Sequence, residues 1–287
     1  MLRLIYTSDL HGDPDLYRSA GEAALRTAAR AVVFGGDLCP GMPSASSVHL
    51  PRSQPEFLLN EVGPMVEGWK RVHPALRVFA IPGNDDCQTI LAALGELEQR
   101  GLVENLHQRA LKLDLFTLVG LSFVPPTPFS IKDFERRDSK RESAREPQIA
   151  RGVVGTSEGF REVEDFEQYL EALPTIEEEL DRFSIGDPER TVAVIHCPPF
   201  QTRCDVLFNG KPIGSRALRR WIEHHQPLLT LHGHIHESPR MSGAFFDRVG
   251  RTLVVNPGAS GREPHIVEID LENLAVLEHS VYGRRKT

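Results

Sequence analysis

The strongest constraint on the fold is a repeated unit in which a short apolar run ends in polar residues. Five such runs lie at 2–7, 31–34, 76–81, 191–195 and 228–231. Helical spacing of apolar residues follows the first three of them, at 15–30, 55–72 and 88–100. Alternating strands and helices predict an α/β layered fold, in which functional side chains collect at the carboxyl ends of strands.

The later apolar runs are less regularly separated by helical patterns. They lie at 112–124, 252–255, 265–270 and 275–282, and they predict a second, more antiparallel sheet packed beside the first. Residues 125–164 lack periodicity, and the near-balanced charges of 132–146 favour a solvated surface loop over a lid that covers substrate. Residues 164–183 resume as a charged amphipathic helix. We expect a single domain over 1–287, with a loop and helix excursion at about 125–185.

The composition is that of an ordinary globular enzyme. A chain of 287 residues with 40% hydrophobic residues is long enough to bury a sizeable core. Its formal charge of −7 argues against a broad nucleic-acid-binding surface and leaves a local basic groove open. No apolar run approaches the roughly 18 residues of a membrane span, and the four cysteines form no paired motif. We therefore expect a cytoplasmic protein with no membrane partner, and its oligomeric state stays open.

The polar residues at the strand ends share one chemistry. They are Asp9, His11, Asp37, Asn84, His196, His234 and His236. Each alone is typical of a turn, a helix cap or a core histidine, but together they supply oxygen and imidazole ligands without thiolate. Such a set suits Mn, Fe, Zn, Ni or Co, and it exceeds what one tetrahedral ion needs. It predicts two divalent ions roughly 3.5–4 Å apart with a shared carboxylate, a positively charged site that attracts phosphate oxygens.

Five motifs occur in the order of a known superfamily. They are 9-DLH-11, 36-GD-37, 83-GND-85, His196 and 233-GHIH-236, and with them the chain resembles the calcineurin-like metallophosphoesterase superfamily. The turn 256-NPGAS-260 resembles one in many bacterial members, and the chain looks most similar to bacterial phosphoesterases of the Icc-related group. The resemblance implies a four-layer αββα sandwich, with two facing mixed β-sheets flanked by helices. It also implies a hydrolase of phosphate esters, with a small phosphorylated substrate, in which a metal-bridging hydroxide attacks phosphorus.

The resemblance implies a role for each polar residue. One metal is held by Asp9, His11 and His236, the other by Asn84, His196 and His234, and Asp37 bridges both. Asn84 thereby also helps to fix the catalytic geometry. Two neighbours are expected to contact ligands rather than metal. They are Asp86, with a plain turn residue as its alternative, and His232, which lies one step deeper in its strand and has a core residue as its alternative.

One position departs from the superfamily pattern. Asp85 stands where the pattern G-N-H-[DE] has a histidine that protonates the leaving group or grips a phosphate oxygen. An aspartate near two divalent ions is expected to be ionised at pH 7, which makes it a poor general acid. Three interpretations follow. The substrates are phosphodiesters or esters with good leaving groups, which we favour, or another group such as His49 or His265 supplies the proton, or Asp85 turns away from the site.

Two other functions compete with this interpretation. A nucleotide phosphohydrolase or nuclease would use the same metals, although the acidic chain favours the nuclease less. A catalytically weak scaffold of the same fold, kept for protein binding, is disfavoured by the intact ligand set. At the rim, Arg203, Arg262 and the segment 200–211 are candidates for substrate contacts that the sequence does not rank.

Overall fold

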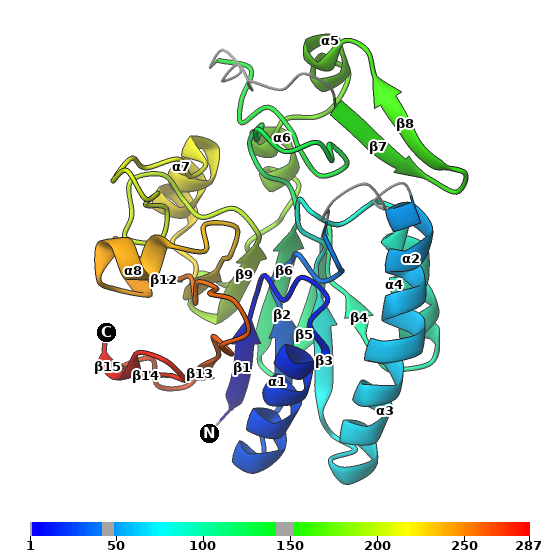
Figure 1. The fold of residues 1–287 in the computed structure, drawn as a ribbon. Coiled ribbons are helices and arrows are strands. Elements are labelled where there is room, and N and C mark those ends of the chain that lie inside the picture. The colour runs from blue at the N-terminus through cyan, green and yellow to red at the C-terminus, as the bar shows by residue number, and fades with distance from the viewer. Residues whose placement is uncertain (1, 42–48, 142–151) are drawn as a thin grey trace.

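Two β-sheets face each other at the centre of the fold (Figure 1). The computed structural model describes residues 2–41, 49–141 and 152–287. The first sheet has the order β15-β14-β13-β1-β2-β3-β4. Its strands are β1 (Arg3–Thr7), β2 (Ala31–Phe34), β3 (Arg77–Ala80), β4 (Glu104–Asn105), β13 (Val267–Asp270), β14 (Val276–His279) and β15 (Gly283–Lys286). Strands β1 to β4 are parallel, and β13 pairs antiparallel with β1.

The second sheet is parallel in its centre, with the order β11-β12-β10-β9-β6-β5. Its strands are β5 (Arg109–Leu113), β6 (Phe116–Leu121), β9 (Thr191–Ile195), β10 (Leu229–Leu231), β11 (Phe246–Val249) and β12 (Thr252–Val255). Only the edge strands β5 and β11 pair antiparallel. The expectation of a second sheet more antiparallel than the first is therefore wrong, since β13 and β14 extend the first sheet instead. An apolar run indicates a strand but carries no information on which sheet edge it pairs with.

Helices cover the outer face of each sheet. The first sheet packs against α1 (Pro14–Thr27), α2 (Leu50–Phe57), η2 (Leu58–Val62), α3 (Gly63–Val72) and α4 (Ile90–Gln99), and the second against α6 (Ile176–Leu180) and α7 (Arg216–His225). A third apolar layer lies between the sheets, so the four-layer αββα sandwich is confirmed. The short elements η3 (Pro188–Arg190) and α8 (Ser238–Ser242) lie in connections. No helix within the described ranges has the length and apolar character needed to cross a membrane.

The excursion differs from its prediction in two ways. Residues 164–183 form two short helices, α5 (Phe166–Glu171) and α6, rather than one. The break coincides with Pro174, which disfavours helical backbone at the preceding residue, and with a capping box that starts α6 at Thr175. The segment 132–141 is not a solvated loop, because Lys132 and Glu135 are fully buried. The rest of the predicted loop, 142–146, lies outside the described residues.

A β-hairpin that the sequence did not suggest follows this segment. Strands β7 (Gly152–Thr156) and β8 (Gly159–Val163) pair antiparallel and lie above α2 (Figure 1). The guanidinium of Arg52 in α2 donates hydrogen bonds to the carbonyl oxygens of Ser157 and Glu158 in the hairpin turn. Since α2 belongs to the first helical layer, these bonds tie the hairpin to the sandwich.

Candidate metal centre

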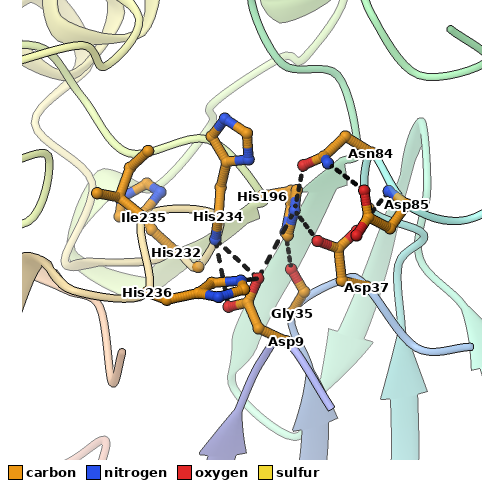
Figure 2. Close-up of polar contacts among 12 residues, drawn as sticks. Asp9, Gly35, Asp37, Asn84, Asp85, His196, His232, His234, Ile235 and His236 are labelled. Carbon is orange, nitrogen blue, oxygen red and sulfur yellow. Dashed lines mark hydrogen bonds and ion pairs between the residues drawn. The ribbon is translucent and has the colours of Figure 1, made fainter. Parts of the chain in front are cut away.

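The polar residues predicted as ligands come together where strands of both sheets end (Figure 2). Asp9 and His11 follow β1, Asp37 follows β2, Asn84 follows β3, His196 follows β9, and His234 and His236 follow β10. The backbone turns sharply at several of these positions. Asp9, His11, Asp37 and His234 have φ values of 59°, 45°, 50° and 66°. Non-glycine residues rarely adopt such left-handed backbone, and its clustering here is typical of a functional site.

Four of the side chains form a compact group. Asp9, His11, Asp37 and His236 each offer one ligand atom, and these atoms all lie within 4.8 Å of one another. The Nε2 atoms of His11 and His236 are 3.2 Å apart, and His236 Nε2 lies 3.2 Å from Asp9 Oδ1. The imidazole nitrogens of His11 and His236 are thus directed at one position beside the carboxylate. The group contains the predicted first ligand set together with the predicted bridging carboxylate, so its donors fit a divalent ion.

The second predicted set also lies next to Asp37, since His196 and His11 both approach Asp37 Oδ2. His196 Nε2 lies 3.4 Å from Asp37 Oδ2 and 3.2 Å from Asn84 Oδ1. The other ring nitrogen of His196, Nδ1, lies 2.8 Å from the Gly35 carbonyl oxygen, to which it donates if it carries the proton. That hydrogen bond leaves Nε2 free to bind a metal. The His234 ring lies next to the His196 ring, with 5.4 Å between centroids, but neither ring belongs to the compact group of four. Binding of a second ion by these residues stays a prediction.

Charge balance explains the protonation of the metal-free group. Burial by itself would lower the pKa of His196, but the facing Asp37 and Asp9 carboxylates raise it to about 9. The pKa of His236 is likewise raised to about 9 by Asp9, against the opposing effect of burial. Burial and the neighbouring His196 lower the pKa of His234 to about 3. Protons on His196 and His236 thus neutralise the two carboxylates, and divalent ions would displace these protons.

Two glycines allow the ligand loops to approach one another. A Cβ atom on Gly233 would lie 2.3 Å from Asp9 Oδ2, and one on Gly83 would lie 2.3 Å from the backbone nitrogen of Asp37. Both distances are far below ordinary van der Waals contact. The Gly233 approach brings the His234 backbone N–H within 3.0 Å of Asp9 Oδ1, to which it donates. The glycines in 83-GND-85 and 233-GHIH-236 are therefore required by packing.

Asp85 points into the site. Its Oδ2 lies 3.6 Å from His11 Nδ1, and its Oδ1 accepts a hydrogen bond of 2.8 Å from Asn84 Nδ2. Its backbone N–H donates to Asp37 Oδ1. The interpretation in which Asp85 turns away is therefore wrong. In the metal-free site, burial and the Asp37 charge raise the pKa of Asp85 to about 7.

Asp86 and His232 support the ligand loops from behind. The buried Asp86 carboxylate accepts backbone hydrogen bonds from Gly83, Leu38 and Cys39. It thereby joins the loop that carries Asn84 to the loop that carries Asp37. The fully buried His232 contacts the carbonyl oxygens at the end of β9 through Nδ1 and the Thr230 hydroxyl through Nε2.

The other candidate proton donors lie in different surroundings. His49 is an exposed residue at the start of α2. The ring nitrogens of His265 lie 2.9 Å from the Pro257 carbonyl oxygen and 2.9 Å from Ser260 Oγ. Of the rim arginines, Arg262 is largely exposed near Asp13, and the Arg203 backbone N–H donates to Asp247. These side-chain contacts of His265 and Arg262 are thus with residues outside the ligand group.

A cavity of about 550 Å³ opens beside the ligand group. Asp37, Asn84, Asp85, His234 and His236 form its polar side. Its apolar side comes from two segments, Pro125–Phe129 and the region of Leu207, Phe208 and Ile213. The first segment lies in the region for which a surface loop is predicted. The apolar character of 123-FVPPTPF-129, within an otherwise charged region, is the sequence feature that could have indicated its place in a cavity.

Comparisons with known proteins agree with this architecture. The family model described as calcineurin-like phosphoesterase matches residues 2–238. The protein TT1561 of Thermus thermophilus has a similar fold, with a TM-score of 0.55 and 17% identity over 98% of this chain and 99% of that one. A dimetal phosphatase from Danio rerio has a TM-score of 0.54 and 14% identity over 100% and 96%. Among curated proteins no significant match is found. Because the family model spans most of its length, the chain belongs to the calcineurin-like phosphoesterase family and is a metallophosphoesterase.

Proposed function

We propose that the protein hydrolyses phosphodiesters, or phosphate esters with good leaving groups, at a centre of two divalent ions. The observation that carries the proposal is the position of Asp37. Its carboxylate belongs to the group with Asp9, His11 and His236, and it also lies 3.4 Å from His196 Nε2. One carboxylate thus faces both predicted ligand sets, as a shared ligand must. Two bound ions would supply positive charge for phosphoryl oxygens and a water of lowered pKa that attacks phosphorus.

The chain's own groups favour an ester that needs little proton assistance. Asp85 occupies the polar side of the cavity, where bound divalent ions would lower its pKa from about 7, so it would be ionised and a poor proton donor. The described part of the cavity lining contains no lysine or arginine that would grip additional phosphates. The described lining is therefore better suited to bind a singly charged diester than nucleotides or nucleic acids, which carry additional phosphates. The whole of 1–287 would act as a single domain in this function.

Metal analysis and an activity panel test the proposal. Chelator-treated protein is reconstituted with Mn, Fe, Zn, Ni or Co, and bound metal is measured by mass spectrometry. We expect two equivalents of metal and hydrolysis of bis-p-nitrophenyl phosphate in preference to p-nitrophenyl phosphate, cyclic nucleotides and single-stranded DNA. The variant Asp37→Asn is expected to lose at least about 100-fold in rate, because it weakens both sites. The exposed Asp15→Asn serves as the control.

Three outcomes would contradict the proposal. Absence of activity with every metal would favour the scaffold of the same fold. Preference for single-stranded DNA or nucleotides would favour the nuclease or nucleotide phosphohydrolase. Binding of a single equivalent of metal, with full activity, would exclude a dinuclear centre.

A further inference from the structure

The cavity beside the ligand group has two exposed aromatic rings on its apolar side. Phe129 and Phe208 are 53% and 65% exposed, and both line the cavity. They come from segments about eighty residues apart in the chain and join the apolar side chains of Leu207 and Ile213. Apolar side chains that gather in one cavity indicate a ligand-binding site, whereas scattered exposed ones need no explanation. Their continuity with His234 and His236 places this apolar surface within the same cavity as the candidate metal ligands.

The charges of the cavity oppose a second anionic group. Its charged carboxyl groups are those of Asp37, Asp85 and Glu237, and no lysine or arginine belongs to the described lining. The Arg240 guanidinium lies 5.2 Å from the Phe208 ring centroid, where it stacks on the ring rather than lining the cavity. A carboxylate or second phosphate on the substrate would therefore meet acidic groups without a described basic partner in the lining.

The aromatic side of the cavity is held in place from within the fold. The buried Lys132 ammonium donates hydrogen bonds of 3.0 Å to the Thr127 carbonyl oxygen and 2.8 Å to Glu135 Oε1. The Phe129 backbone N–H donates to Thr127 Oγ1 at 3.1 Å. On the other segment, the Phe208 backbone N–H donates to Glu237 Oε1 at 3.2 Å. Both rings thus stand on segments fixed by hydrogen bonds, so a ligand need not order them.

From these contacts we infer that the cavity takes a phosphoric ester carrying an uncharged, apolar substituent, which packs between Phe129 and Phe208. The inference rests on the proposed function, since the metal centre would hold the phosphoryl oxygens. The aromatic rings would hold the substituent, and the acidic groups would exclude substituents with carboxylates or phosphates. Phe129 and Phe208 are thus specificity-determining residues.

The test uses inert phosphinates, which lack a hydrolysable P–O–C bond. Dimethylphosphinate, methyl(phenyl)phosphinate and (4-carboxyphenyl)(methyl)phosphinate share one anionic head group and differ in one substituent. Calorimetry on the Mn-loaded protein is expected to show binding of the phenyl compound about tenfold or more tighter than the dimethyl compound, from burial of one ring. The added carboxylate should remove that gain. Phe129→Ala and Phe208→Ala should each reduce the phenyl preference and leave dimethylphosphinate affinity within about twofold.

A matched control is Leu115→Ala, which removes an apolar side chain that is 63% exposed and lies outside the cavity. It should leave all three affinities unchanged. Equal affinity for the phenyl and dimethyl compounds, or an unchanged phenyl preference in both phenylalanine variants, would overturn the inference. Failure of hydrolysis alone would count against the proposed function and not against these binding ratios. Failure of every phosphinate to bind the metal-loaded protein would overturn both.

Discussion

Replacement of Gly83 by alanine places a methyl group inside the metal centre. The new Cβ would lie 2.2 Å from Asp37 Oδ1, 2.3 Å from the Asp37 backbone nitrogen and 2.7 Å from His196 Nε2. The side-chain atoms can rotate away, but the backbone nitrogen cannot. Ordinary Cβ contacts begin at 3.4 Å, so the two loops must separate by about 1.1 Å, the difference between 3.4 and 2.3 Å. Gly83 does not have a positive φ, so the effect is steric rather than conformational.

A separation of this size is large for a metal site. Ligand distances hold to within about 0.2 Å, and a misplacement of about 1 Å near a reacting centre costs on the order of 100-fold in rate. Gly83 directly precedes Asn84, and the displaced partner is Asp37. We therefore expect Gly83→Ala to lose about one equivalent of bound metal and about 100-fold in kcat/KM. Overpacking should also lower the free energy of unfolding by about 1–3 kcal/mol.

The matched control is Gly95→Ala in α4. A Cβ atom there meets no other atom within 4 Å, and alanine is favoured over glycine inside a helix by about 0.5–1 kcal/mol. This variant should be slightly more stable than the wild type and fully active. Metal content by mass spectrometry, urea unfolding and hydrolysis of bis-p-nitrophenyl phosphate are measured on both variants. If Gly83→Ala bound two metals and retained activity within about threefold, the steric argument would be refuted.

Four further predictions concern protons and charges. In the metal-free protein the pKa values of His196 and His236 are about 9, because the nearby carboxylates outweigh the effect of burial. Metal binding displaces these protons, so metal affinity should rise with pH up to about 9. A metal affinity that calorimetry finds constant from pH 6 to 9 would contradict this. These folded-state pKa values exceed the unfolded-state value of about 6.5. The protonated His196 and His236 should therefore stabilise the metal-free protein fully below about pH 6.5, and this stabilisation should be lost as the pH rises through 9. Urea unfolding across this pH range measures the effect. Lys132→Met breaks a fully buried ion pair and should lower the free energy of unfolding by about 3–5 kcal/mol. The control Lys140→Met removes an exposed ion pair and should change that free energy by less than about 1 kcal/mol. Equal urea midpoints for the two variants would contradict this difference. Asp85→Asn removes a negative charge beside the phosphoryl site and should raise kcat/KM for an anionic diester about threefold, and a tenfold fall would instead identify Asp85 as a catalytic group.

The local pattern of the chain was sufficient to predict the layered fold, and it singled out the polar residues at the strand ends as ligand candidates. Apolar runs that end in Asp9, Asp37 and His196 predict strands whose carboxyl ends carry ligands. Parallel strands of one sheet end at one edge, so residues far apart in sequence must approach each other there. The structure brings the seven predicted ligands together, and metal binding by them stays a prediction. The structure adds that Gly83, beside Asn84, fits between these close loops because it has no Cβ atom.

Tertiary structure alone decided the rest. The sequence predicts a solvated loop around Lys132, because charged side chains are mostly exposed unless they are paired. In the structure Lys132 is buried because Glu135 pairs with it. Strand β13 pairs at the edge next to β1 rather than in the second sheet, since an apolar run does not specify its neighbour. The aromatic side of the cavity joins Phe129 to Phe208 across a long stretch of chain. Such contacts depend on how distant segments pack against each other, whereas the periodicity of a sequence reports only local structure.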